Sequence, residues 1–401
     1  MNVFPTNVIP VTEDYTDIHE YLFYAEAEPF SCVKPAIPVS DLKIQDYSIE
    51  NEFLKLSIEH GNVNITDKIA EKTYSDFIKI TDCADIGDSY NFGALKEDKK
   101  ILAEICGSKI LETGPYRAAI EIDFVISIPV SSGETGRSEH LTRHFLKVVS
   151  FLECGAKYLE FKVNWENKSE NHLLQVQFCF DEPITKTFSD DLSGIVERAF
   201  ESDYDIYKKI PAPRGIELNY NTAPAQSFVS TLGVGILSDR SLEYEVYSNT
   251  LSLTLLRSTG IISNPKNPTR GTPAGPPLPA PALQMLGERS DRFGLTFDTE
   301  NLYAYSEKFK GALLGLLSNF ETDCLFSSQN ENIVAISVKT NPKNDLIIHF
   351  MNISEKPQYF DFVTKFSYKD IKILNSLDEP CCDYSPRMLE SRAIIAISLN
   401  T

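Results

Sequence analysis

Residues 82–92 hold the densest group of side chains in this sequence that could bind a ligand. Three carboxylates stand three residues apart and are followed by an aromatic residue and an amide: Asp82, Asp85, Asp88, Tyr90 and Asn91. Carboxylates accept hydrogen bonds from hydroxyls, a tyrosine ring can cover a sugar face, and an amide fixes orientation. Gly87 lets the backbone turn sharply among them. The pattern predicts hydroxyl binding; a plain polar turn is the alternative, because Asp and Gly are common turn residues.

Motifs for bond-breaking chemistry do not accompany this stretch. His140 and His144 stand four residues apart, but no H-E-x-x-H pattern surrounds them, and in a strand that spacing is too long for a shared metal. The sequence contains no G-x-S-x-G nucleophile turn and no glycine loop that could cradle a phosphate. We therefore expect no catalytic residue and no metal ligand on this chain.

Composition narrows the class of partner. The chain has 401 residues, room for about two to three domains. Its net charge of −19 argues against nucleic acid or an anionic membrane as partner, since both attract basic surfaces. The eight cysteines show no zinc-ligand spacing, and the first residues lack the basic and apolar segments of a signal peptide. These features favour a cytoplasmic protein.

Strict alternation of apolar and polar residues predicts long antiparallel strands in positions 120–128, 159–165 and 174–180. A hairpin is expected at 53–65, and the turn at 167–171 is interpreted as a second hairpin. No long helices alternate with these strands, so the fold class is all-β, a large antiparallel β-sandwich followed by a smaller one. The expected divisions are 1–45, the end of a small β domain with a linker, then 46–318 and 319–401.

A proline-rich stretch interrupts the strand pattern. Residues 264–287 contain seven prolines and three glycines, together with leucine and methionine that a mobile linker would lack. We interpret this stretch as a long ordered loop laid over the sandwich, where such loops often carry function.

Several motifs in one order resemble a known family. Residues 85–92 (DIGDSYNF) resemble the D-x-G-D-x-Y-N-F loop in the C-terminal half of glycoside hydrolase family 38, in its bacterial α-mannosidase and mannosylglycerate hydrolase branch. Residues 163–172 (VNWENKSENH) are similar to a strand and turn of that branch, and 253–260 (LTLLRSTG) to its L-T-L-L-R-S-x-G run. Arg270 and 274–281 (AGPPLPAP) continue the likeness.

The resemblance implies a supersandwich fold like that of galactose mutarotase, and it implies a partial enzyme. In this family the zinc ligands and the nucleophilic aspartate come from an N-terminal β/α barrel and helical bundle, which no part of this sequence resembles. The chain is thus expected to be the C-terminal portion of a retaining α-mannosidase. Zinc is expected in the complete enzyme and not on this chain. The barrel would partner it in cis or in trans, and the sequence leaves a homo-oligomer open.

The resemblance also assigns substrate-binding roles. Tyr90, beside Asn91, is implied to reach sugar hydroxyls of an α-mannoside or another carbohydrate. The second implied contact is an arginine, with Arg270 as first choice and Arg257 as second; for Arg257 a structural ion pair is an equal alternative. Three residues are implied to shape the loop rather than to act on the substrate: Asp85, Gly87 and Asp88.

A different class of function stays open. The chain could be a non-catalytic carbohydrate-binding or scaffolding β protein, associated with a separately encoded barrel. Its single tryptophan, Trp165, alternates with core residues, which counts against an independent sugar-binding face built on stacked aromatic rings.

Overall fold

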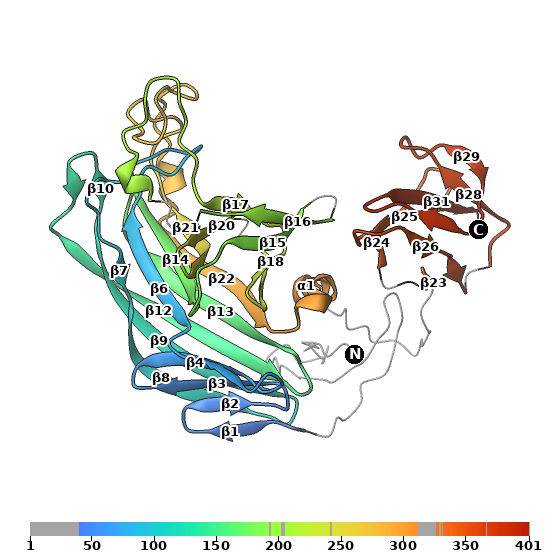
Figure 1. Ribbon diagram of the computed structural model, residues 1–401, viewed down its shortest axis with the longest axis horizontal. Coiled ribbons are helices and arrows are strands. Elements are labelled where there is room, and N and C mark those ends of the chain that lie inside the picture. The colour runs from blue at the N-terminus through green and yellow to red at the C-terminus, as the bar shows by residue number, and fades with distance from the viewer. Residues whose placement is uncertain are drawn as a thin grey trace, which may run out of the picture. The chain divides into compact units, whose positions relative to one another are not determined.

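The computed structural model describes residues 40–191, 194–201, 205–240, 243–311, 326–328, 330, 332–365 and 367–400. The end of a small β domain and the linker expected at 1–45 lie outside these residues up to position 39. The chain divides into two compact units, a large one mainly within 38–311 and a small one mainly within 312–401. Nearly all regular structure in the described residues is antiparallel β, which confirms the all-β fold class (Figure 1).

Three sheets build the large unit. The nine-stranded sheet has the order β16 (Gly194–Ala199), β15 (Lys186–Asp191), β18 (Phe228–Thr231), β19 (Val234–Ser238), β22 (Gly287–Thr296), β13 (Tyr158–Asn167), β12 (Leu141–Glu153), β9 (Arg117–Pro129), β8 (Glu104–Thr113). The six-stranded sheet has the order β17 (Thr222–Pro224), β20 (Glu243–Tyr247), β21 (Thr250–Arg257), β14 (His172–Cys179), β6 (Ile78–Ala84), β7 (Ile101–Leu102). The five-stranded sheet runs β1 (Lys43–Gln45), β2 (Ser48–Glu50), β3 (Leu54–Glu59), β4 (Asn62–Asp67), β5 (Lys72–Tyr74). A short ribbon pairs β10 (Ser132–Gly133) with β11 (Gly136–Arg137).

One continuous apolar core joins these sheets, because each strand turns its alternate residues inward. Phe178 of β14 meets Phe293 of β22 edge to face, with ring centroids 5.7 Å apart, so the six-stranded and nine-stranded sheets are in direct contact. Tyr74 of β5 stacks on Phe297 at 5.1 Å, which brings the five-stranded sheet into the same core. Trp165 is buried here at 5% exposure, in the core as its alternation predicts.

The hairpin expected at 53–65 is present as β3 and β4. The prediction of a second hairpin at the turn 167–171 is wrong. β13 pairs with β12 and β22, whereas β14 pairs with β21 and β6, so this turn carries the chain from one sheet to the other. Alternation reports which face of a strand is buried and not which strand lies beside it, and both sheets bury their inner faces in the same core.

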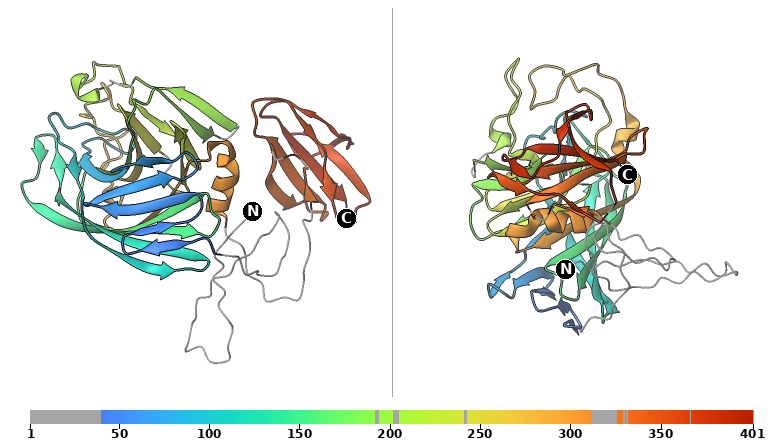
Figure 2. Two further views of the ribbon diagram at one scale, coloured as in Figure 1. Left: turned by 60° about the horizontal axis from the view of Figure 1, so that its bottom comes forward. Right: turned by 90° about the vertical axis from the view of Figure 1, so that its right-hand side faces the viewer.

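The small unit is a second, smaller sandwich, as predicted. Its five-stranded sheet has the order β24 (Ile333–Thr340), β25 (Leu346–Asn352), β31 (Ile394–Asn400), β28 (Asp370–Leu374), β29 (Pro380–Asp383), drawn in red in Figure 2. Two short pairs accompany it, β23 (Phe326–Ser327) with β27 (Val363–Thr364), and β26 (Gln358–Phe360) with β30 (Arg387–Leu389). Aromatic residues from the sheet and the pairs share one core, as the 5.0 Å contact of Phe350 with Phe360 shows.

Helix is sparse in the described residues. It comprises α1 (Leu302–Lys310) and three short 3-10 segments, η1 (Ile206–Lys208), η2 (Pro281–Gln284) and η3 (Thr299–Asn301). α1 packs on β19 so closely that a Cβ at Gly235 would lie 2.2 Å from the Leu302 side chain. Within the part of the chain that the structure describes, no helix has the length and apolar character needed to cross a membrane.

Candidate functional site

Three loops that are distant in the sequence meet at one end of the large unit, at the upper left of Figure 1. They are residues 85–100, 205–221 and 258–286, and we call their assembly the tip. Backbone hydrogen bonds tie them together: Ser89 N donates to Ile261 O at 3.2 Å, and Leu218 N donates to Thr269 O at 2.8 Å. The proline-rich stretch is therefore an ordered loop, as predicted, and it packs on the carboxylate-rich loop.

Asp85 organises the start of the first loop from a fully buried position. Its Oδ1 accepts hydrogen bonds from the backbone N–H groups of Gly87 at 2.8 Å and Gly93 at 2.9 Å. Its Oδ2 pairs with Nε of Arg257 at 2.7 Å. Burial raises the pKa of this carboxyl above its ordinary value, although the arginine and the two amides oppose the rise.

Gly87 is required by contact and not by a positive φ. A Cβ on Gly87 would lie 2.1 Å from the carbonyl oxygen of Asn91, and a Cβ on Gly93 would lie 2.3 Å from the Gly87 nitrogen. Both clashes are with backbone atoms, which cannot swing away. The two glycines therefore allow the two arms of the loop to touch.

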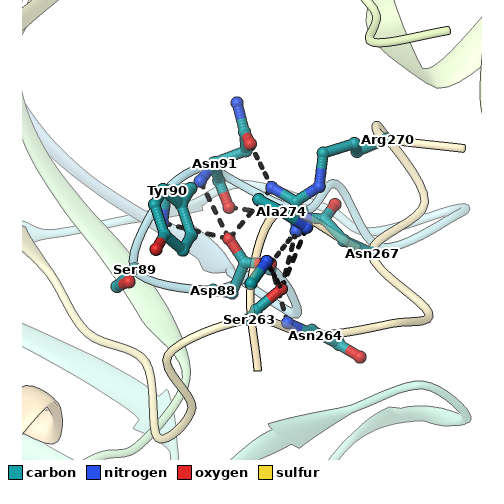
Figure 3. Close-up of polar contacts among 12 residues, drawn as sticks. Asp88, Ser89, Tyr90, Asn91, Ser263, Asn264, Asn267, Arg270 and Ala274 are labelled. Atoms are coloured by element: carbon teal, nitrogen blue, oxygen red, sulfur yellow. Dashed lines mark hydrogen bonds and ion pairs between the residues drawn. The ribbon is translucent and has the colours of Figure 1, made fainter. Parts of the chain in front are cut away.

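Asp88 is the centre of the tip (Figure 3). Its Oδ1 accepts from the N–H groups of Tyr90 and Asn91, both at 3.0 Å, and its Oδ2 accepts from Asn264 N at 2.8 Å. The guanidinium of Arg270 forms an ion pair with the same carboxylate. Burial works against ionisation, but the hydrogen bonds from Arg270 and the backbone amides outweigh it and hold the pKa of Asp88 below its ordinary value. The charged carboxylate thus clamps the first loop to the third.

Both candidate arginines are turned inward. Arg270 is 6% exposed; its Nε donates to Thr272 O at 2.8 Å and its Nη1 donates to the side-chain oxygen of Asn91. Arg257 pairs with Asp85 and donates through Nη2 to the backbone oxygen of Asp88. For Arg257 this geometry is that of a structural ion pair. Both guanidinium groups therefore bind groups of the protein.

Tyr90 faces outward from the first loop of the tip. Its side chain is 55% exposed, and the Arg270 guanidinium carbon lies 5.9 Å from its ring centroid. A Cβ on Gly275 would lie 3.2 Å from the phenol oxygen, so the third loop fits against the tyrosine. Beside it, Asn91 accepts from Arg270 and donates to Glu217 Oε1 at 2.5 Å. The arrangement presents an aromatic ring and a hydroxyl on a braced loop, which suits binding of a polyol.

Asp82 does not join the tip. It is fully buried at the end of β6, where Oδ2 meets His172 Nδ1 at 2.6 Å and Oδ1 pairs with Arg137. The other ring nitrogen of His172 lies 3.0 Å from Asn167 Oδ1. This polar layer sits beneath the turn at 167–171 and fixes it.

His144 belongs to the same layer. Its Nε2 accepts from Lys168 N at 3.1 Å, and its ring centroid lies 6.5 Å from that of His172. Burial, and next the charge of His172, lower the pKa of His144 to about 4. The histidine is therefore a neutral acceptor at ordinary pH.

Sequence reasoning missed two residues that hold the third loop. Ser263 Oγ accepts from the N–H groups of Ala274 and Gly275, both at 3.1 Å. Gln284 binds Asn171 through both ends of its amide, at 2.9 and 2.7 Å. The Asn-Pro pairs at 264–265 and 267–268 carry the available turn signal, but no sequence pattern identifies these distant partners.

The described residues do not fit a zinc ion, since they contain no group of three or more His, Cys, Asp or Glu side chains that could hold a metal.

The sequence of this chain is similar to that of a known protein family and of a curated relative. The family model described as the glycosyl hydrolases family 38 C-terminal domain matches residues 49–261. A putative mannosylglycerate hydrolase of Halalkalibacterium halodurans is 27% identical over 233 residues, 53% of this chain and 25% of that protein.

Two solved structures from Enterococcus faecalis share the fold. One is an α-mannosidase of strain V583, with a TM-score of 0.74 and 21% identity over 91% of this chain and 43% of that one. The other is a protein in glycosyl hydrolase family 38, with a TM-score of 0.74 and 20% identity over 91% and 45%. The chain spans about a quarter of the length of the curated relative and less than half of each solved chain.

Proposed function

The chain belongs to glycosyl hydrolase family 38 as its C-terminal domain, and from this premise we propose that it is the β-sandwich portion of a retaining α-mannosidase acting on terminal α-mannosides. The names of its relatives, an α-mannosidase and a putative mannosylglycerate hydrolase, support this substrate class. In this proposal the large domain comprises 46–318 and the small domain 319–401. The protein is cytoplasmic. Neither nucleic acid nor a membrane is its partner.

The observation that carries the proposal is the half-exposed Tyr90 beside Asp88 and Asn91, whose side chains are held by hydrogen bonds within the protein. Tyr90 contacts the hydroxyls and ring face of the sugar. Asn91 and Arg270 act as positioning residues, because their hydrogen bonds hold the loop that carries the tyrosine. Arg257 and Asp85 support the same loop from below.

Bond cleavage is assigned to a different part of the enzyme. A retaining mechanism needs two carboxyl groups, one as nucleophile and one as acid and base. We place these groups, and the zinc site, on an N-terminal barrel that joins this chain in cis or in trans. This chain completes the substrate pocket and stabilises the barrel.

An assay and a titration test the proposal. The chain alone, supplied with zinc and a chromogenic α-mannoside, should give no turnover; robust turnover that a chelator abolishes would overturn it. Methyl α-D-mannoside should bind weakly at the tip. Tyr90→Ala should lower that affinity about tenfold, in keeping with the loss of one aromatic contact, and Tyr90→Phe should lower it less. A matched control is Tyr47→Ala, because Tyr47 is similarly exposed, at 58%.

The second candidate is a non-catalytic carbohydrate-binding or scaffolding protein. The exposed Tyr90 favours it equally, since that residue could bind sugar without any barrel. Co-expression with the barrel of a family 38 enzyme separates the two. Restored mannosidase activity that depends on Tyr90 supports the enzyme portion, and sugar binding without any restored activity supports the second candidate.

A further inference from the structure

A cavity of about 300 Å³ lies on the outer face of the six-stranded sheet, opposite the core. Its floor is formed by β14, β20 and β21, and its walls come from residues 92–100 and 205–221. We call it the outer-sheet pocket. Its walls thus belong to two loops of the tip, but it contains neither Tyr90 nor Arg270. The volume is at the lower end of the range for small-molecule sites, about 300–1,000 Å³.

Two carboxylates of this pocket, those of Glu245 and Asp98, are only partly used. Glu245 Oε2 accepts from Gln175 Nε2 at 2.9 Å and lies 3.9 Å from Lys100 Nζ, while its Oε1 has no hydrogen-bond partner among the described residues. Asp98 accepts from Ala84 N at 2.7 Å through Oδ2 alone. Each group therefore keeps an oxygen available for a further donor.

Donors and aromatic rings line the same space. Lys100 and Gln177 contribute N–H groups, and Tyr207 contributes a phenol. Burial, followed by the nearby negative charges, raises the pKa of Tyr207, so its hydroxyl stays protonated. The Tyr220 ring meets Phe92 edge to face at 5.5 Å, and Tyr247 stands at the rim with 49% of its side chain exposed.

We infer that the outer-sheet pocket binds one neutral sugar unit, as a second carbohydrate site separate from the one at Tyr90. A sugar hydroxyl both donates and accepts, which matches a wall that mixes carboxylates, an amide, an ammonium and a phenol. The aromatic rings offer apolar faces for the C–H side of a pyranose. An organic cation is the competing ligand. It fits less well, because it has no acceptor for Lys100 and Gln177, and the ammonium of Lys100 would repel it.

The test is a titration of the full chain with methyl glycosides of mannose, glucose, galactose and N-acetylglucosamine, followed by saturation-transfer NMR. At least one sugar should bind at millimolar concentration. Tyr247→Ala and Gln177→Leu should each weaken that binding about tenfold, whereas Tyr47→Ala should not change it. Tyr247 is half-exposed, so its loss should leave the fold intact.

The two sites are told apart by Tyr90→Ala. If the pocket binds sugar, part of the saturation transfer persists in Tyr90→Ala, and adding Tyr247→Ala to that variant weakens the remaining binding about tenfold. If Tyr90→Ala removes all sugar binding, the pocket proposal is overturned and the proposed tip function stands. If only the pocket variants lose binding, the tip function fails and the pocket proposal stands.

Removing the negative charge of Glu245 distinguishes a neutral sugar from an organic cation as the ligand of the pocket. Glu245→Gln keeps a hydrogen-bonding oxygen and removes the negative charge, so binding of a neutral sugar should change by less than about threefold. Tetramethylammonium serves as the cationic probe. Binding of that ion to the wild type, lost in Glu245→Gln, together with no binding of any sugar in the panel, would refute a neutral sugar site.

Discussion

The two buried carboxylates at the centre of the tip and the carboxylates of the outer-sheet pocket are used in opposite ways. Asp85 and Asp88 are covered by donors from the protein, and together they hold two arginines and several backbone amides. In the pocket, Glu245 and Asp98 bind the protein through one oxygen each and leave the other to the cavity. A dense polar motif can therefore be a scaffold that displays one side chain, whereas dispersed polar residues can form an open site.

The largest expected effect is the loss of charge at Asp88. Asp88→Asn should leave the 6%-exposed Arg270 without its carboxylate and lower the free energy of unfolding of the large unit by about 3–5 kcal/mol. Denaturant unfolding measures this change. The matched control is Glu197→Gln, which breaks the exposed pair with Lys186 and should cost about 0–1 kcal/mol. Equal losses of unfolding free energy in the two variants would show that the Asp88–Arg270 pair stabilises the protein no more than an exposed surface pair does.

Acid should destabilise the polar layer beneath the turn at 167–171, to which His144 belongs. The pKa of His144 is lowered to about 4 from an ordinary value near 6.5. Between these two pH values the unfolded chain binds more protons than the folded chain, so stability falls as the pH drops through that window. The full loss is on the order of 3 kcal/mol.

The measurement is denaturant unfolding as a function of pH. His144→Gln keeps an acceptor for Lys168 N but cannot take up a proton, so it should remove this slope. A slope that persists unchanged in the variant would assign the acid sensitivity to another group.

An intermediate loss of stability is expected when a side chain is added at Gly87, where two backbone segments touch. Gly87→Ala places a Cβ against the Asn91 carbonyl and should cost about 1–3 kcal/mol, with a matching loss of sugar binding at Tyr90. Gly133→Ala is the control, because no atom lies within 4 Å of a Cβ there. Thermal unfolding compares the two; similar melting temperatures would mean that the loop arms are less closely packed than the structure shows.

The smallest change in stability is expected at Glu245 of the outer-sheet pocket, in contrast to Asp88 of the tip. Glu245→Gln should change the free energy of unfolding by less than about 1 kcal/mol, because the carboxylate is joined only to Gln175 and, at 3.9 Å, to Lys100. Chemical unfolding of this variant beside Asp88→Asn gives the comparison directly. A cost as large as that of Asp88→Asn would place Glu245 in the scaffold and not in an open site.

The sequence predicts the strands well where alternation follows burial, as it does in β13. It does not predict strand partners, so the crossing between sheets at 167–171 was interpreted as a hairpin. The loop motif grouped Asp85, Asp88, Tyr90 and Asn91, which the tip contains, with Asp82, which lies outside it. It did not predict the inward direction of Arg257 and Arg270, which depends on buried carboxylates. Residues of the outer-sheet pocket, such as Asp98 and Glu245, come from separate segments with no shared motif.

The clamp between Asp88 and Arg270 joins positions 182 residues apart in the chain. Such a contact forms late in folding, because the entropy of closing the intervening chain must first be offset by the sheets between them. The displayed tyrosine therefore has its binding geometry only after both sheets have docked. Slow amide hydrogen exchange at residues 88–91 would mark completed folding of the large unit, and a partly folded chain would offer no site to a sugar.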